Sequence, residues 1–138
     1  MTHRTMREFL AVLEKKGLLR RIARPVDCAW EPAALARWMY QALPEEKRFG
    51  MFFEKVKGCD IPIATAALGA NTAAYATALG IEADGINDAW VRAFRNPIAP
   101  SVVDKAPCQE VVMTGKEVRL SCLPIPVWTP GKDKGAYI

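Results

Sequence analysis

The position of its prolines most constrains what this chain of 138 residues can fold into. Six of the ten prolines fall after residue 96, at positions 97, 100, 107, 124, 126 and 130. Pro124 and Pro126 each hold φ at about −65° and lack a backbone donor, so the segment Leu123–Pro126 cannot be an inner strand. We therefore expect a folded domain over residues 1–96, a proline-rich linker over 97–109, and the extended start of a further domain over 110–138.

The first helix has a strong start signal. Thr5 and Glu8 have the spacing of a capping box, in which the threonine hydroxyl accepts from the Glu8 amide. Apolar residues follow at helical spacing, and Gly17 lies where a helix needs a left-handed residue to end. The apolar stripe of this helix consists of Met6, Phe9, Leu10 and Leu13.

The remaining pattern predicts an alternation of strands and helices. A helix should begin at Glu31 and Pro32, since proline suits a first turn, and end near Ala42. Asn71 and Gly80 are the expected cap and stop of a third helix. The inner face of the helix that begins at Glu31 is expected to consist of Leu35, Trp38, Met39 and Ala42. Strands are expected at 18–23, 49–56 and 61–67, a fourth helix at 86–95, and a hairpin turning at residues 114–117.

These elements indicate an α/β fold. We expect a mixed β-sheet packed with about four helices and followed by an extended arm. Trp30, Trp38 and Trp90 are predicted to anchor a core or an interface.

The net charge of +4 allows two interpretations of the basic residues near the first helix. They could form a patch for phosphates or nucleic acid, or they could be a solvated helix end and strand face. We favour the second interpretation, because no recognition helix and no aromatic platform accompanies them. These residues are Lys15, Lys16, Arg20, Arg21 and Arg24. No apolar run approaches the ~18–20 residues that cross a bilayer, and no secretory signal is apparent, so we expect a cytoplasmic protein.

The inventory of reactive side chains is small. His3 is the single histidine, and the four cysteines lack a Cys-x-x-Cys spacing, so we predict no catalytic residue and no metal ligand on this chain. A cytosolic cysteine is seldom in a disulfide, and we expect small buried thiols. The four are Cys28, Cys59, Cys108 and Cys122.

Several ordered motifs together resemble the N-terminal region of the UbiD-type decarboxylases, which use prenylated flavin mononucleotide (FMN). The opening from Met6 to Ile22 is similar to the start of that family, and the segment Phe52–Gly58 is similar to its Phe-Glu-Asn-x-Lys-Gly motif. The remaining matches are residues 25–27, 61–63, 97–100, 106–110, 123–126 and 135–138.

The resemblance implies a domain that leads into a flavin-binding split barrel absent from these residues. Family members carry out non-oxidative decarboxylation of aromatic or α,β-unsaturated acids, with the modified flavin as electron sink. The resemblance further implies a divalent metal (Mn or Mg), a K ion, and a flavin prenyltransferase that supplies the cofactor. The family's Asn, His and Glu ligands and its Glu-Arg-Glu proton network lie further along, and none can be placed on this chain.

Two functional hypotheses follow. In the first, the chain is the N-terminal domain or small subunit of such a decarboxylase, in a homo- or hetero-oligomer with the catalytic part, and lacks an active site of its own. In the second, it is a non-catalytic regulatory module, or a truncated fragment, of a full-length relative. Under the first, the arm lies near the site or docks a partner through Leu123, Pro124, Pro126, Trp128 and Tyr137.

Overall fold

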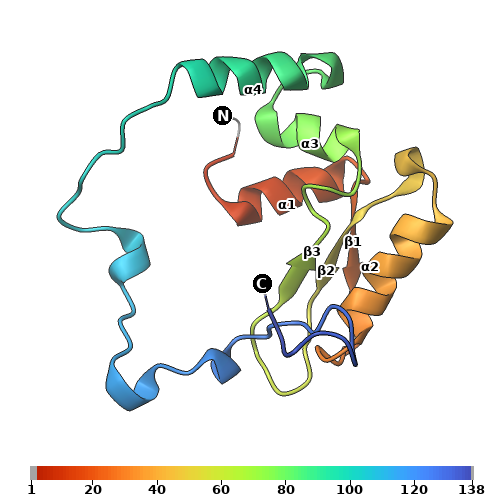
Figure 1. Cartoon of the computed structure of the whole chain (residues 1–138), viewed down its shortest axis with the longest axis vertical. Coiled ribbons are helices and arrows are strands. Elements are labelled where there is room, and N and C mark those ends of the chain that lie inside the picture. The colour runs from red at the N-terminus through yellow and green to blue at the C-terminus, as the bar shows by residue number, and fades with distance from the viewer. Residues whose placement is uncertain (1–2, 138) are drawn as a thin grey trace.

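The computed structural model describes residues 3–137, and its first half is a small α/β sandwich (Figure 1). The described elements are α1 (Met6–Lys15), β1 (Leu19–Ile22), α2 (Glu31–Ala42), β2 (Gly50–Phe53), β3 (Ile63–Thr65), α3 (Thr72–Leu79) and α4 (Ile86–Arg95). Short 3₁₀ turns join several of them. The expected α/β fold, with four helices and a small mixed sheet, is confirmed.

The sheet has the strand order β1-β2-β3. Strand β1 pairs with β2 in parallel, with Leu19 opposite Gly50, and β2 pairs with β3 antiparallel, with Phe53 opposite Ile63. Helix α2 forms the crossover that a parallel pair requires. Gly50 has a steric role in this pairing, because a Cβ there would lie 2.9 Å from Leu19 Cδ1 and 3.0 Å from the Ala67 backbone.

The strand residues alternate between two cores. On one face of the sheet, Met51 and Phe53 pack with Met39 of α2. On the other, Leu19 of β1 packs with Leu13 of α1 and Ala74 of α3. Because a strand sends successive side chains to opposite faces, β1 and β2 contribute to both layers.

Local signals place the helix ends as expected. Thr5 Oγ1 accepts from Glu8 N at 3.2 Å, although the Glu8 carboxylate reaches Arg4 N at 2.8 Å instead of Thr5. Gly17 and Gly80 both take positive φ, and Asn71 Oδ1 accepts from Ala74 N at 2.8 Å. The caps therefore behave as local chemistry dictates.

Helix α2 corrects one expectation. Its buried residues include Ala33, Ala36 and Met39, whereas Trp38 and Ala42 are exposed and Leu35 is half-buried. Small alanines let the helix lie close to the sheet, and the indole at position 38 is left on the solvent side. Trp30 and Trp90 are also exposed, so these tryptophans do not anchor a core, and their role as interface anchors stays a prediction.

The second half of the chain differs from the sequence-based expectation of a hairpin. The hairpin expected at residues 114–117 is a 3₁₀ turn, Gly115–Glu117, and no strand occurs between residue 66 and residue 137. Gly115 does take the positive φ that a turn needs. Residues 97–122, here called the exposed linker, leave the domain in a wide arc (Figure 1), and their backbone hydrogen bonds close local turns.

Candidate functional site

The chain returns to the domain after the exposed linker. Residues 123–137, here called the docked arm, lie beside the loop between β1 and α2 (Figure 1). Val127 N donates to Cys28 O at 3.3 Å, and the Cys28 thiol donates to Pro124 O at 3.1 Å. The Cys59 thiol donates to the carbonyl of Cys122, directly before the arm, at 3.4 Å. Two segments of the domain thus hold the returning chain.

The docked arm closes on itself at its two ends. Tyr137 N donates to Pro126 O at 3.2 Å, and Trp128 Nε1 donates to Tyr137 O at 2.9 Å. Inside this loop, Thr129 N donates to Asp133 Oδ2 at 2.6 Å. A compact loop closed at its neck in this way is typical of functional surface loops.

The structure brings together four of the five arm residues singled out from the sequence. Pro126 is buried, Pro124 accepts from the Cys28 thiol, and Trp128 and Tyr137 bond each other across the neck. Leu123 stays exposed at the edge of the contact. The last residue of the 135–138 motif, Ile138, lies outside the described residues.

The thiols at this contact act as hydrogen-bond donors. Burial, and then the nearby charges of Asp27 and Cys59, raise the pKa of Cys28. A raised pKa keeps the thiol protonated, which is the form that donates to the Pro124 carbonyl. Cys28 and Cys59 are half-buried and Cys108 and Cys122 are exposed, so the expectation of four buried thiols is wrong.

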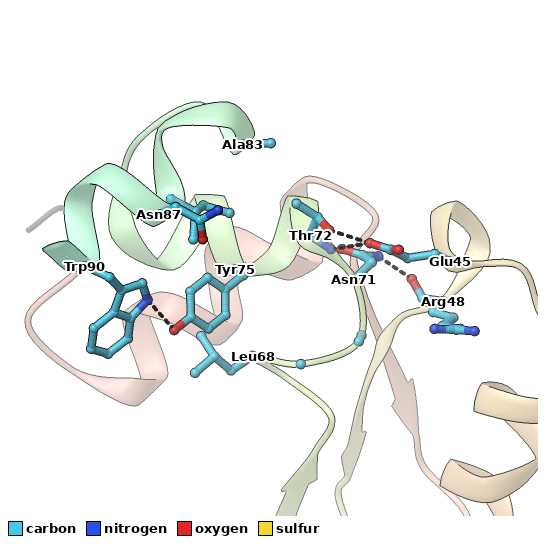
Figure 2. Close-up of a pocket in the computed structure, with 12 residues that line it drawn as sticks. Glu45, Arg48, Leu68, Asn71, Thr72, Tyr75, Ala83, Asn87 and Trp90 are labelled. Atoms are coloured by element: carbon cyan, nitrogen blue, oxygen red, sulfur yellow. Dashed lines mark hydrogen bonds between the residues drawn. The ribbon is translucent and has the colours of Figure 1, made fainter.

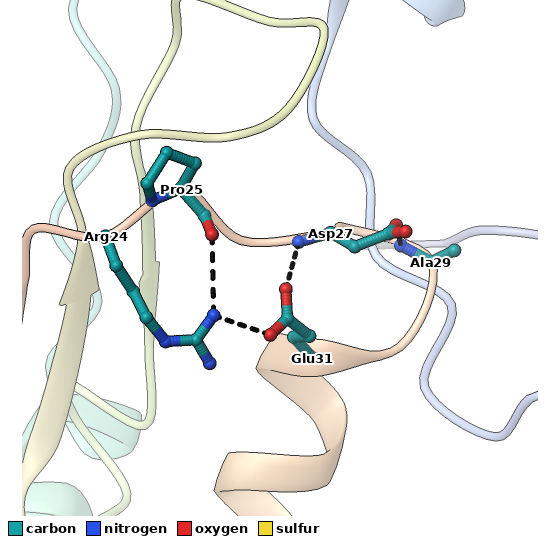
Figure 3. A network of polar contacts seen from close by, with 5 residues as sticks. All are labelled: Arg24, Pro25, Asp27, Ala29 and Glu31. Carbon is teal, nitrogen blue, oxygen red and sulfur yellow. Dashed lines mark hydrogen bonds and ion pairs between the residues drawn. The ribbon is translucent and has the colours of Figure 1, made fainter.

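A polar network fixes the loop that receives the arm (Figure 3). Glu31 Oε2 accepts from Asp27 N at 2.5 Å, and Glu31 Oε1 accepts from Arg24 Nη1 at 2.6 Å. Asp27 Oδ1 in turn accepts from Ala29 N at 2.9 Å. The bond from the Asp27 amide, and then the one from Arg24, lowers the pKa of Glu31.

This network was not found from the sequence. The available signal was an acidic residue in the first turn of a helix, seven positions after an arginine and four after the residue whose amide it bonds. A charge at that place also suits the positive end of the α2 dipole. The network positions Cys28 beneath the arm.

A hollow lies between α3 and α4 (Figure 2). It is an open groove of about 630 Å³. One side carries Trp90, whose Nε1 donates to Tyr75 Oη at 2.9 Å. On the other, Thr72 N donates to Glu45 Oε1 at 3.0 Å, and the Thr72 hydroxyl also donates to Glu45. The bonds from Thr72, first its hydroxyl and then its amide, lower the pKa of Glu45. The carboxylate therefore already occupies the N-terminus of α3.

The basic residues near α1 make contacts within the domain. Arg21 pairs with Glu14 at 2.7 Å and with Glu54 at 3.3 Å, and Arg20 stacks on the Phe49 ring at 4.1 Å. These contacts favour the interpretation of a solvated strand face over that of a nucleic-acid patch.

The groove between α3 and α4 has no group of side chains that could hold a metal ion. Among residues 3–137, no three His, Cys, Asp or Glu side chains gather into a group that could hold a metal ion. His3 Nε2 donates to Thr77 O at 3.2 Å, and its ring tilts against Phe9. The described residues therefore offer no ligand set for the divalent metal that the resemblance implies, and we derive no chemical step through a metal or a flavin. Within the same range, no helix combines the length and apolar character of a membrane crossing.

Comparison with known proteins gives a consistent result. Residues 10–94 match the family model of the 3-octaprenyl-4-hydroxybenzoate carboxy-lyase N-terminal domain, UbiD_N. An evolved dimeric form of the UbiD-class enzyme HmfF from Pelotomaculum thermopropionicum, in complex with prFMN, superposes with a TM-score of 0.81 at 32% identity. That match covers 99% of this chain and 30% of the HmfF chain.

Two further solved structures agree. HmfF in complex with FMN gives a TM-score of 0.78 at 33% identity, over 96% of this chain and 28% of that one. The closed form of vanillic acid decarboxylase (ShVdcCD) from Sedimentibacter hydroxybenzoicus gives 0.74 at 29% identity, over 94% and 28%. The chain thus spans less than a third of the length of these solved chains.

Proposed function

The chain belongs to the UbiD family, whose N-terminal domain it contains, and from this premise we propose that it serves as that domain in a non-oxidative decarboxylase. The substrate class we propose is an aromatic or α,β-unsaturated carboxylic acid. The cofactor we propose is prenylated FMN, with a divalent metal (Mn or Mg) and K, bound by residues outside the segment described here.

One observation carries this proposal. The family model ends at residue 94, but the superposition on HmfF with prFMN continues over 99% of the chain, so it includes the exposed linker and the docked arm. The part of this chain after α4 therefore has a counterpart in an enzyme that holds the modified flavin. The likeness extends over both halves and is not confined to the sandwich.

When bound, prenylated FMN supplies an electron sink for the charge left as carbon dioxide departs. The residues described here fix the path of the chain as it leaves the domain. Glu31 and Arg24 hold the loop that carries Cys28, Cys28 holds Pro124, and Pro126 holds Tyr137. This chain of contacts sets where the polypeptide leaves the domain, which determines how a following domain would be placed on it.

The proposal includes partners and location. We propose a homo- or hetero-oligomer with the catalytic part of the same enzyme, a flavin prenyltransferase as cofactor supplier, and a cytoplasmic setting. The relatives give a precedent for oligomers, since one HmfF form is dimeric and the vanillic acid decarboxylase is described with a second component, ShVdcD.

Co-expression tests the proposal. The coding region that follows these residues is expressed together with them and with a flavin prenyltransferase, and the purified protein is examined by ultraviolet–visible spectroscopy and by carbon dioxide release from a cinnamate-like acid. We expect flavin absorbance and turnover from the complete protein and neither from the 138-residue chain. One equivalent of flavin on the 138-residue chain alone would overturn the assignment of the cofactor to other residues. Absence of flavin and turnover from the complete protein would instead favour a regulatory module.

A further inference from the structure

Three of the four cysteines lie at the point where the docked arm begins. Cys28 belongs to the loop between β1 and α2, Cys59 to the loop between β2 and β3, and Cys122 directly precedes the arm. The thiols of Cys28 and Cys59 bond the carbonyls of Pro124 and Cys122, and Figure 1 shows the returning chain passing both loops. Segments far apart in the sequence thus bring free thiols to one place.

The loop between β2 and β3 holds Cys59 in a defined position. Cys59 N donates to Val56 O at 3.2 Å and closes a turn in which Gly58 takes positive φ. Ile61 N donates to the sulfur of Cys59 at 3.5 Å. Val56 is buried in the core between the sheet and α2, so the turn rests on packed residues. From this position the Cys59 thiol reaches Cys122 O at 3.4 Å.

Cys122 lies in a part of the chain that can adjust. It ends the 3₁₀ turn Leu120–Cys122, it is exposed, and its amide and its thiol both donate to Arg119 O, three residues back. A cysteine side chain has three staggered positions about χ1. Because Cys59 Sγ already bonds the main chain of Cys122, the two sulfurs come together through one side-chain rotation and a small adjustment of the turn.

The other two cysteines differ from this pair. Cys28 is half-buried, its thiol donates to Pro124 O at 3.1 Å, and burial raises its pKa, which keeps it in the unreactive protonated form. Cys108 is exposed but belongs to a separate turn, Pro107–Gln109. Of the clustered thiols, Cys122 is therefore the most open to a reagent, and Cys59 is the one placed to react with it next.

We propose that Cys59 and Cys122 form a reversible disulfide that fastens the docked arm to the loop between β2 and β3. The reagent is a low-molecular-weight disulfide of the glutathione class. The Cys122 thiolate attacks one sulfur of the reagent, which gives a mixed disulfide and releases one small thiol. The Cys59 thiolate then attacks the sulfur of Cys122 and releases the second small thiol.

The exchange is balanced, because one disulfide is reduced, one is formed, and the two protein protons leave on the two small thiols. Disulfides in a reducing compartment are usually transient, and exposed ones are readily reduced again. The bond would hold Pro124 over Cys28, since the arm could no longer swing away from the loop. This modification is separate from the proposed function and does not rest on it.

Glutathione disulfide tests the proposal in the 138-residue chain. The protein is incubated with an excess of the reagent, disulfides are located by peptide mass spectrometry, and alkylation of Cys28 is timed before and after. We expect a disulfide between Cys59 and Cys122 that reduced glutathione reverses. We also expect alkylation of Cys28 to become at least about tenfold slower, because local opening of the arm exposes this thiol.

Three variants sharpen the test. Cys59→Ser should stop at the mixed disulfide, with glutathione retained on Cys122 and Cys28 alkylation unchanged. Cys122→Ser changes an exposed position, so it leaves the core intact, and it should form no internal disulfide. Cys108→Ser is the matched control and should behave as wild type does.

Glutathione retained on Cys122 of wild type would overturn the proposal, because Cys59 would then be out of reach. A disulfide that includes Cys28, or one that joins two chains through Cys108 or Cys122, would overturn it as well. A disulfide between Cys59 and Cys122 that leaves Cys28 alkylation unchanged would show that the bond does not fasten the arm.

Discussion

The sandwich of residues 5–79 buries its large apolar side chains, whereas many of those in the chain after residue 96 are exposed. In the sandwich, Phe53, Leu13 and Met39 are wholly buried against other elements. In the exposed linker, Ile98 and Val102 are almost wholly in solvent. The difference shows that the apolar side chains of the sandwich find partners within residues 5–79, whereas those of the exposed linker find none among the described residues.

Core truncation should give the largest contrast between the two regions. Phe53→Ala removes a wholly buried ring and should lower the free energy of unfolding by about 3–5 kcal/mol, because a cavity is left between the sheet and α2. Ile98→Ala should change it by less than about 0.5 kcal/mol in the 138-residue chain. Chemical denaturation followed by tryptophan fluorescence measures both. A linker variant that destabilises the chain as much as Phe53→Ala would show that the two regions fold as one.

Removing a helix cap should have a smaller effect, confined to the sandwich. Asn71→Ala deletes the side chain that accepts from Ala74 N and donates to Arg48 O at 2.6 Å, so we expect a loss of about 1–2 kcal/mol. Asn87→Ala, at an exposed position of α4 that lines the groove of Figure 2, serves as the control and should be nearly neutral. Thermal unfolding distinguishes the two, and equal melting temperatures would contradict the role given to Asn71.

The loop beneath the docked arm should respond to acid. Because the pKa of Glu31 is lowered in the folded state, its contribution to stability is present above the unfolded value of about 4.3 and is lost as pH falls through the lower folded value. The melting temperature of wild type should therefore exceed that of Glu31→Gln by a constant difference near neutral pH. This difference should shrink below about pH 4.

Glu46→Gln, an exposed carboxylate in the turn before β2, is the control for that experiment. Glu45 also has a lowered pKa, but it is present in both proteins and cancels in the difference. A difference that stays constant down to strong acid would show that the charge of Glu31 does not hold the loop.

The smallest expected effect concerns the docked arm itself. Alkylation of Cys28 should be slower than that of Cys108, because Cys28 is half-buried, has a raised pKa and bonds Pro124. Trp128→Ala removes the bond to Tyr137 and should speed Cys28 alkylation a few-fold without changing Cys108. Peptide mass spectrometry after timed alkylation reads both thiols. Equal rates for Cys28 and Cys108 in wild type would show that the arm is not docked.

The parts of the fold that local chemistry governs could be predicted from the sequence. Thr5, Gly17, Asn71 and Gly80 each act through neighbours within a few positions, and each takes the expected role. Positions decided by packing could not be predicted in this way. Trp38 has the right spacing for the inner face of α2, but the alanines at 33 and 36 face inward instead.

In the candidate site too, local features could be predicted and contacts between distant residues could not. Prolines at 124 and 126 correctly indicated that this segment is not an inner strand, but the hydrogen bond from Cys28 to Pro124 joins residues 96 positions apart, which no local pattern reports. The hairpin expected near Gly115 failed for a related reason. Strands need a partner, and among the described residues this segment has none within reach. Its apolar residues gave a strand-like pattern that a partner domain would have to complete.

Hydrogen exchange tests most directly the claim that the sandwich is complete and the linker awaits a partner. Amide exchange is measured for residues 5–79 and 97–122 in the 138-residue chain and in the longer polypeptide that the proposed function expects, with its flavin-binding portion. We predict unchanged protection in the sandwich and exchange at least about a hundredfold slower in the linker of the longer protein. Equally fast linker exchange in both proteins would contradict the account.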